Sequence, residues 1–317
     1  MKLLLLFYFS SCLLLHAEDN KVYYDSEGKI TTSSQATFYR ISNQYPIADR
    51  FQMTDFYMNG IVAASGAYMT SSHTIKDGEF VYYYPNGQVK SKGIYKENLR
   101  LGEWKWWYPN GQEMKESLIL HTNSLPNEEI ELTINFWDAD GNHVVRQGKG
   151  ELIQYNEHQY VGELRVLAKG SILDGLKHGP WQGYDYNGNL LYKELYQDGI
   201  LLRGKAFVEN GSKIRYNTLS KAPMPVGGVN NLRKHIVNSL KYPRNARYEN
   251  ISGQVLVQFV VDEDGSIHDV QTIKGIGGGC DEEAERVIQS FGDWEPGVQR
   301  GQLRTSRMIM PISFEIQ

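Results

Sequence analysis

SGQVLVQFVVDEDG, from Ser252 to Gly265, is the stretch that decides the fold of the C-terminal part of this chain. Val255, Val257 and Phe259 alternate with other residues, and a period of two is typical of a strand that buries one face. The acidic residues and the glycine that end the stretch are typical of a tight turn. Residues 267–273 return as a second strand, so the stretch predicts a β-hairpin.

Helical patterns flank this hairpin on both sides. Upstream, apolar residues recur at helical spacing over residues 229–240, with Asn230 or Asn231 available as the N-cap. Pro243 ends that helix and starts a second, short helical turn. Downstream, GGGCDEEAERVIQSF (Gly277 to Phe291) predicts a third helix, because acidic residues in its first turn suit the helix dipole.

A last strand is expected in RMIMPISFEI, from Arg307 to Ile316. Its alternation predicts two faces, with Met308, Met310, Ile312, Phe314 and Ile316 inward and Arg307, Ile309, Ser313 and Glu315 outward. A terminal strand with one neighbour exposes unpaired N–H and C=O groups, which bind an extended peptide by strand addition. Pro311 lacks the N–H donor, so such pairing should be interrupted there. The alternative is a purely structural strand that the chain itself covers.

Five segments agree in order and spacing with one known family. They are KYPRNAR (Lys241 to Arg247), the hairpin stretch, the glycine-rich helix start, WEPG (Trp294 to Gly297) and the last strand. Together they resemble the C-terminal domain of TonB, which couples inner-membrane energy to outer-membrane receptors in Gram-negative bacteria. The resemblance covers about a third of the chain. It implies a small domain of helices packed on a three-stranded antiparallel sheet.

The same resemblance implies a set of partner-binding residues. In TonB the strand that matches residues 304–316 pairs with the TonB box of outer-membrane receptors, and a Tyr-Pro pair touches the receptor. Lys241 precedes that pair here, where the family often has glutamine. The candidate residues are Tyr242, Pro243, Arg304, Ser306, Arg307, Ile309, Ser313 and Glu315. The alternative for the pair is that Tyr242 packs in the core and Pro243 stops a helix.

A ten-residue unit recurs between Lys21 and Tyr216. Its clearest copies are GEFVYYYPNG (Gly78 to Gly87), GEWKWWYPNG (Gly102 to Gly111) and GPWQGYDYNG (Gly179 to Gly188). Weaker copies end at Gly28, Gly60, Gly141 and Gly211, and GELIQYNEHQ (Gly150 to Gln159) lacks the final glycine. Asn-Gly accepts positive φ at both central positions, which predicts two-residue hairpin turns. Aromatic residues at alternate positions before each turn predict strands that stack against their neighbours.

These units resemble MORN repeats, in the variant found in bacterial YwqK-like proteins. The resemblance covers residues 22–216 and implies a spacer or a surface for protein contacts. Eight hairpins would give about sixteen strands, or about 75 Å in one row at ~4.8 Å per strand. MORN-like repeats are also linked to lipids, but no basic amphipathic surface is predicted from the sequence.

The N-terminus is typical of an export signal. Lys2 supplies the positive start, and the apolar run from Leu3 to Leu15 would rise roughly 20 Å as a helix, short of a ~30 Å hydrocarbon core. Cleavage is expected after Ala17, and the alternatives are an uncleaved anchor or lipidation at Cys12. The predicted organisation is a signal peptide (1–17), hairpin repeats (18–216), a linker (217–228) and the TonB-like domain (229–317). The fold class is therefore α+β.

Several functions are disfavoured by the sequence. The net charge of -4 does not favour nucleic-acid binding. No catalytic motif, cofactor site or metal site is predicted: the acidic turn at 262–264 lacks the spacing of a calcium loop, and the glycines at 275–279 lack a βαβ unit. Cys280 is left without a disulfide partner once the signal is removed. It is expected to be a small buried residue, the alternative being a thiolate at a helix start.

The leading hypothesis is a non-enzymatic envelope protein of the TonB type, located in the periplasm. Its partners would be outer-membrane receptors or other envelope proteins, with membrane contact only if the N-terminus is uncleaved. TonB itself begins with a membrane helix and a proline-rich spacer, and here the repeats would replace the spacer. The alternative is a periplasmic scaffold whose repeats bind protein and whose C-terminal strand forms a homodimer.

Overall fold

The computed structural model describes residues 21–316, apart from residues 27, 44, 46, 48, 73, 123–124, 156–165 and 209–210. The predicted signal segment, with Cys12 and Ala17, lies outside the described residues. The described chain falls into two compact units that divide between Gly179 and Pro180. The domain limits expected from the sequence stay a prediction.

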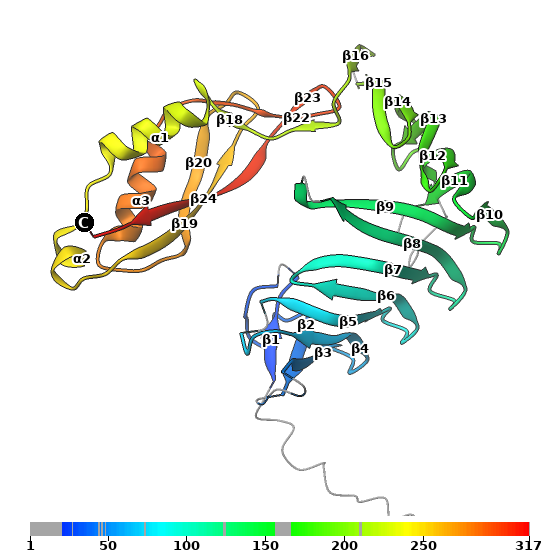
Figure 1. Cartoon of the computed structure of the whole chain (residues 1–317), viewed down its shortest axis with the longest axis horizontal. Coiled ribbons are helices and arrows are strands. Elements are labelled where there is room, and N and C mark those ends of the chain that lie inside the picture. Colours follow the sequence, from blue (N-terminus) through cyan, green and yellow to red (C-terminus); the bar gives the residue numbers. More distant parts are fainter. Residues whose placement is uncertain are drawn as a thin grey trace, which may run out of the picture. The chain divides into compact units, whose positions relative to one another are not determined.

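Antiparallel hairpins build the first unit (Figure 1). Its strands are β1 (Val22–Tyr24), β2 (Phe38–Ser42), β3 (Phe51–Tyr57), β4 (Val62–Tyr68), β5 (Lys76–Tyr83), β6 (Val89–Lys96), β7 (Leu99–Trp107), β8 (Glu113–Thr122), β9 (Leu125–Trp137), β10 (His143–Arg146), β11 (Lys149–Tyr155) and β12 (Val166–Leu173). β13 (Leu176–Tyr184) crosses the division, and β14 (Leu190–Gln197), β15 (Ile200–Phe207) and β16 (Lys213–Tyr216) belong to the second unit. The sixteen described strands follow one another in the sheet as they do in the sequence, which confirms the expected hairpin repeat.

The Tyr-Pro-Asn-Gly turns differ from the prediction. In the copy between β5 and β6, the Gly87 N–H donates to Tyr84 O (2.8 Å) and the Tyr84 N–H donates to Gln88 O (2.8 Å). Gly87 has a φ of 86°, whereas Asn86 is outside the left-handed region. This geometry fits a type I turn followed by a left-handed glycine. The physical reason is Pro85, whose ring fixes φ near −65° and so excludes the positive φ that a two-residue type I′ turn needs.

Two-residue turns close the opposite ends of the hairpins. Between β6 and β7, Glu97 and Asn98 have φ values of 51° and 72°. Asp198 and Gly199 have 50° and 80° between β14 and β15. Positive φ at both positions defines a type I′ turn. The repeat therefore alternates two kinds of turn.

Tyrosines link each repeat to the next. Three hydroxyls donate to main-chain carbonyls one hairpin further on: Tyr57 to Tyr83 O (2.7 Å), Tyr84 to Trp107 O (2.8 Å) and Tyr108 to Trp137 O (2.9 Å). These bonds satisfy polar groups that the stacked hairpins bury, which a phenylalanine could not do. The tyrosine of the repeated unit thus stabilises the contact between neighbouring hairpins.

Aromatic rings fill the inside of the first unit by lying over glycines. Phe80 on β5 lies in register with Gly66 on β4 and with Gly93 on β6. Trp104 on β7, 2% exposed, lies over Gly93, and a Cβ added at that glycine would overlap the indole ring. Because glycine leaves the sheet surface bare, a large ring on the next strand takes that space.

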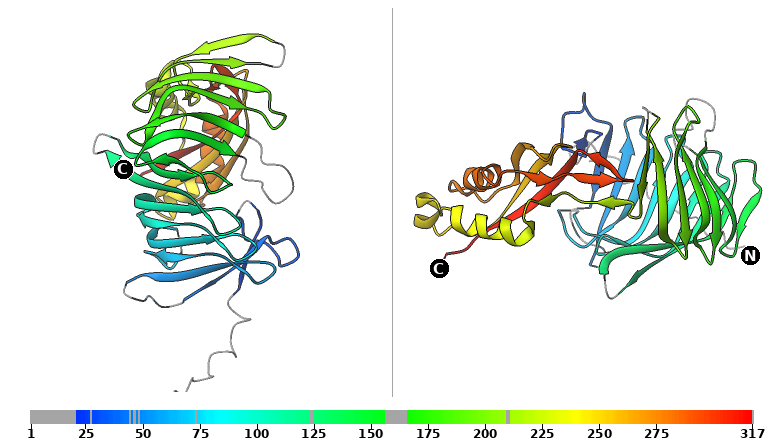
Figure 2. Two further views of the ribbon diagram at one scale, coloured as in Figure 1. Left: turned by 90° about the vertical axis from the view of Figure 1, so that its right-hand side faces the viewer. Right: turned by 90° about the horizontal axis from the view of Figure 1, so that it is seen from above.

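The C-terminal part of the second unit contains three small sheets and three helices (Figure 2). Its elements are β17 (Ser220–Lys221), β18 (Met224–Pro225), α1 (Gly228–Ser239), α2 (Arg244–Tyr248), β19 (Gly253–Val261), β20 (Ile267–Lys274), α3 (Cys280–Gln289), β21 (Trp294–Glu295), β22 (Gly297–Gln299), β23 (Gln302–Arg304) and β24 (Ser306–Phe314). The sheet orders are β17-β22-β23, β18-β21 and β20-β19-β24. The predicted helices and three-stranded sheet are confirmed.

The core of this part lies between the helices and one face of β19. That face consists of Val255, Val257, Phe259 and Val261, all fully buried as predicted. Leu232 of α1 and the apolar side of α3 pack against it. No helix within the described residues has the length and apolar composition needed to cross a membrane.

Two details of the sequence prediction are wrong. Gly227 precedes α1 as its N-cap, and the Asn231 side-chain amide donates back to Val226 O (2.9 Å) instead of accepting a helical N–H. Ile316 is 44% exposed, because β24 ends at Phe314 and the inward alternation ends with it.

Candidate functional site

β24 is an edge strand with one described neighbour. It pairs with β19 in an unbroken register from Ser306, opposite Val261, to Phe314, opposite Gly253. Met308, Met310, Ile312 and Phe314 face the core, and Arg307, Ile309 and Ser313 are exposed on the other face, as predicted. Ile309 is 54% exposed. Along the part of the chain that the structure describes, the second edge of β24 pairs with no other strand.

Pro311 indicates which main-chain groups point to that edge. It lies opposite Leu256 of β19. A proline nitrogen directed at β19 would leave a gap in the ladder, so prolines in edge strands face away from the neighbouring strand. Main-chain groups in an antiparallel strand alternate between the two sides. The N–H and C=O groups of Ile309 and Ser313, two residues to either side, are therefore expected at the open edge.

The opposite edge of the same sheet is protected. On β20 the Thr272 N–H donates to the Glu285 carboxylate of α3 (2.6 Å), so a side chain already occupies that donor. Asp269 has a φ of 51°, and the register with β19 shifts at two places. Bulges, charges and capping groups are the usual means by which sheet edges resist pairing. β24 lacks such shifts, so the two edges of this sheet differ in their readiness to accept a strand.

Tyr242 and Pro243 lie near the end of β24 and are tied into the fold. The Tyr242 hydroxyl donates to Ile251 O (2.5 Å), and its ring meets Phe314 edge-on, with centroids 5.7 Å apart. Pro243 precedes α2 as its N-cap residue. The structure therefore gives both residues a structural role beside β24, and their contact with a partner stays a proposal.

The remaining candidate residues lie at the two ends of β24. Arg304 is on β23, where it pairs with Gly297, and Ser306 begins β24. At the other end, Ser313 and Glu315 line a pocket with Gly253 and Gln254 of β19. The structure thus brings Ser313, Glu315 and, through Phe314, Tyr242 to one end of the strand, and leaves Arg304 at the other end.

A buried carboxylate at the end of the repeats was not foreseen from the sequence. The Glu194 side chain is 0% exposed, and it accepts hydrogen bonds from the Tyr216 hydroxyl (2.7 Å), the Tyr196 hydroxyl (2.9 Å) and the Arg300 Nε (2.8 Å). The Arg300 guanidinium also lies over the Tyr192 ring, 3.9 Å from its centroid. Arg300 stands in the turn between β22 and β23, so it joins this turn to β14.

The environment of Glu194 shifts the proton affinity of its neighbours. Burial, and then the hydrogen bond to Glu194, raise the pKa of Tyr216. Burial and the charge of Glu194 raise the pKa of Tyr196 in the same way. For Arg300, burial opposes the charge, but the hydrogen bond and charge of Glu194 outweigh it and raise the pKa of the guanidinium. The cluster therefore keeps both hydroxyls protonated as donors.

Alkaline solution is expected to destabilise the protein. An unfolded tyrosine ionises near pH 10, whereas Tyr196 and Tyr216 keep their protons to higher pH in the folded state. Above about pH 10 the unfolded state binds fewer protons, so the free energy of unfolding falls as the pH rises. Thermal midpoints from pH 8 to 12, with tyrosinate absorbance, measure this. Tyr248→Phe, at an exposed site, should leave the curve unchanged, whereas a midpoint constant up to pH 11 would contradict the expectation.

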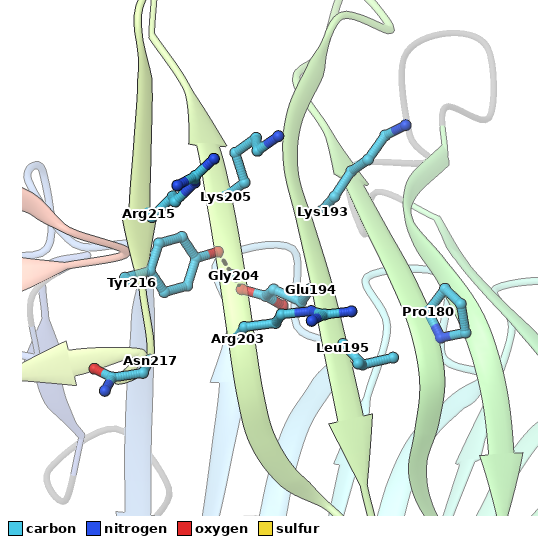
Figure 3. Close-up of a pocket in the computed structure, with 10 residues that line it drawn as sticks. All are labelled: Pro180, Lys193, Glu194, Leu195, Arg203, Gly204, Lys205, Arg215, Tyr216 and Asn217. Carbon is cyan, nitrogen blue, oxygen red and sulfur yellow. Dashed lines mark hydrogen bonds between the residues drawn. The ribbon is translucent and has the colours of Figure 1, made fainter.

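A second unforeseen feature is a pocket on β14, β15 and β16 (Figure 3). Lys193, Arg203, Lys205 and Arg215 line it; they are called the basic face below. A basic surface on these strands was not predicted from the sequence. The signal was present in the sequence, because Arg203 and Lys205 are two residues apart and alternate residues of a strand share a face. The sequence does not show how β14, β15 and β16 pair, so it could not predict that the cations of these three strands lie together.

Cys280 is fully buried at the start of α3. Burial raises the pKa of its thiol, and the neighbouring Asp281 and Glu282 act in the same direction. This supports the small buried residue over the reactive thiolate. Among the described residues, no group of histidine, cysteine, aspartate and glutamate side chains has a geometry that could hold a metal ion.

The family models agree with both sequence resemblances. Residues 238–316 match the family of the Gram-negative bacterial TonB protein C-terminal, and residues 76–97, 100–117 and 177–198 match the MORN repeat variant. These matches confirm both resemblances over the matched residues. Among solved structures, this chain is similar to the NMR solution structure of the Helicobacter pylori TonB C-terminal domain. The two are 22% identical over 28% of this chain and 80% of that chain, with a TM-score of 0.23. No curated protein matches the chain.

Proposed function

We propose that the C-terminal domain binds an extended segment of an outer-membrane receptor by strand addition along β24, in TonB-dependent transport. The observation that carries this proposal is the pairing of β24, which engages β19 on one side and no described strand on the other. Main-chain hydrogen bonds would give the affinity. Arg307, Ile309 and Ser313, exposed beside the open edge, would select among segments.

The contrast between the two sheet edges supports this assignment. An incoming strand at β20 would have to displace Glu285 from Thr272 and follow a bulged register. At β24 it would meet nine residues in continuous register, interrupted as a donor only at Pro311. We therefore expect a bound segment to run on both sides of Pro311, with one missing hydrogen bond opposite it.

Ile309→Pro is the variant that tests the strand. It should remove one edge-directed N–H, leave the ladder with β19 intact, and weaken binding about tenfold or more. Met310→Pro is the matched control, since its N–H points to β19 and its loss should damage the fold itself. Ile309→Ala keeps the donor and should retain most of the affinity. The measurement is fluorescence anisotropy of the full chain with peptides from the periplasmic N-terminal segments of outer-membrane receptors, with circular dichroism as the folding check.

N-methylation of the bound peptide gives a second readout that does not depend on the fold of a variant. Methylation at alternate positions should abolish binding, and methylation between them should not, because only alternate N–H groups face β24. Equal affinity for all methylated peptides would exclude strand addition. If the chain pairs with a second copy of itself through β24 and with no receptor peptide, the protein is an assembly module instead.

The envelope location belongs to the same proposal. It rests on the sequence of residues 1–17, with its lysine, apolar run and terminal alanine. We expect the mature protein to begin at Glu18, in the periplasm. N-terminal sequencing of the protein from its native host tests this, and an intact Met1 would favour an anchored form that could transmit force from an inner-membrane motor.

A further inference from the structure

The basic face differs from the rest of the sheet in how its charges are arranged. Lys205 on β15 lies directly opposite Lys193 on β14 and Arg215 on β16 (Figure 3). Lys92 on β6 also lies opposite Lys105 on β7, but each of these lysines has a carboxylate partner, Glu79 at 2.8 Å and Glu116 at 2.5 Å. Like charges directly opposite one another destabilise a sheet. The three cations in one row are therefore unfavourable for the fold.

Among the described residues, no acidic side chain neutralises this face. Glu194 is the carboxylate among the residues that line the pocket. Its side chain is fully buried and forms an ion pair with Arg300. Within the described chain, no ion pair or hydrogen bond involves the side chains of Lys193, Arg203, Lys205 or Arg215. Four cations thus lie together on three neighbouring strands, with no counter-charge from the described part of the chain.

We propose that the basic face binds an acidic segment of a partner protein in extended conformation. Arg203 and Lys205 are two residues apart on β15, which places them about 6.6 Å apart along the strand. Alternate residues of any extended peptide have the same period, so acidic residues at positions i and i+2 reach both cations. Lys193 and Arg215, about 4.8 Å to either side, surround the carboxylate that meets Lys205.

An acidic peptide fits this surface better than a membrane does. Binding to a lipid surface uses apolar side chains that enter the acyl region beside the basic ones. Among the residues that line the pocket, Pro180 and Leu195 supply the aliphatic surface, and the aromatic residue, Tyr216, is held in place by its hydrogen bond to Glu194 (2.7 Å). The face therefore offers charge in a regular arrangement, with little to insert into a bilayer. This surface is separate from β24, so the inference goes beyond the proposed function and does not depend on it.

The test uses the full chain and two fluorescein-labelled peptides with four glutamates each among threonines. One peptide has its glutamates at alternate positions, and the other has them at every third position. We expect the alternating peptide to bind at least fivefold more tightly, and its affinity to fall steeply between 50 and 300 mM salt. Lys205→Glu should weaken it at least tenfold. Lys234→Glu on α1, an exposed site with the same charge change, should have no effect.

The thermal midpoint of unfolding shows whether Lys205 serves peptide binding or the stability of the fold. Lys205→Glu relieves the repulsion from Lys193 and Arg215, so it should raise the midpoint by about 1–2 °C while it weakens peptide binding at least tenfold. A lowered midpoint would overturn the inference, because the lysine would then serve the fold. Equal affinity for both peptides, or binding to anionic phospholipid vesicles without peptide binding, would overturn it as well. Ile309→Pro should leave binding of the acidic peptide unchanged, which separates this result from the strand addition proposed for β24.

Discussion

Replacement of Arg300 by alanine is expected to lower the free energy of unfolding by about 3 kcal/mol. The substitution leaves the carboxylate of Glu194, which is 0% exposed, without its positive partner. Breaking a buried ion pair by removal of one member costs about 3–5 kcal/mol, and we expect the lower end because Arg300 is 28% exposed. Two tyrosine hydroxyls remain as donors and soften the loss further.

Urea unfolding followed by circular dichroism measures this effect, and two further variants define its cause. Arg304→Ala lies on the same hairpin, with an exposed side chain, and should change the stability by less than about 0.5 kcal/mol. Glu194→Gln combined with Arg300→Gln should cost less than the sum of the single changes, because neither charge is then left alone. A loss below about 0.5 kcal/mol for Arg300→Ala would mean that this ion pair does not fix the hairpin to β14.

The sequence predicts the C-terminal fold well because its signals are local. The alternation of Val255 to Val261, the acidic start of α3 and the terminal strand each follow from a few neighbouring residues. The open edge of β24 could also be anticipated from the resemblance. The bulged and capped edge of β20 could not, because it depends on Glu285, a residue from another element, reaching Thr272.

The repeats were predicted less completely from the sequence than the C-terminal domain was. Pattern alone placed their hairpins but assigned the wrong turn to Tyr-Pro-Asn-Gly, where Pro85 decides the geometry. The Glu194 cluster joins distant positions, because Glu194 meets Arg300, more than a hundred residues further along the chain. Such pairs become visible only when register and topology are known. The basic face is an intermediate case, since two of its cations are neighbours on one strand and the others come from the pairing of three strands.

Trp104→Ala is expected to have the largest effect in the first unit, with a loss of about 3–5 kcal/mol. The indole is 2% exposed, lies over Gly93, meets Tyr95 edge-on with centroids 5.2 Å apart, and donates from Nε1 to Ile94 O (3.3 Å). Its removal leaves a cavity between β6 and β7 that the stiff sheet cannot close.

Gly93→Ala should destabilise the same unit by about 1–3 kcal/mol, because the new methyl group would overlap the indole and the buried ring cannot move aside. Gly93 does not require the left-handed conformation, so the backbone itself accepts alanine. In the Trp104→Ala background the methyl group enters the vacated space, and the same change should be neutral or stabilising by about 0.5 kcal/mol. Urea unfolding of the four proteins measures the coupling between the two sites. If the effects of the two substitutions on the free energy of unfolding are additive, Gly93 and Trp104 do not act as one unit. Gly204 and Tyr216 form a similar pair in the last hairpin, where the same coupling is expected.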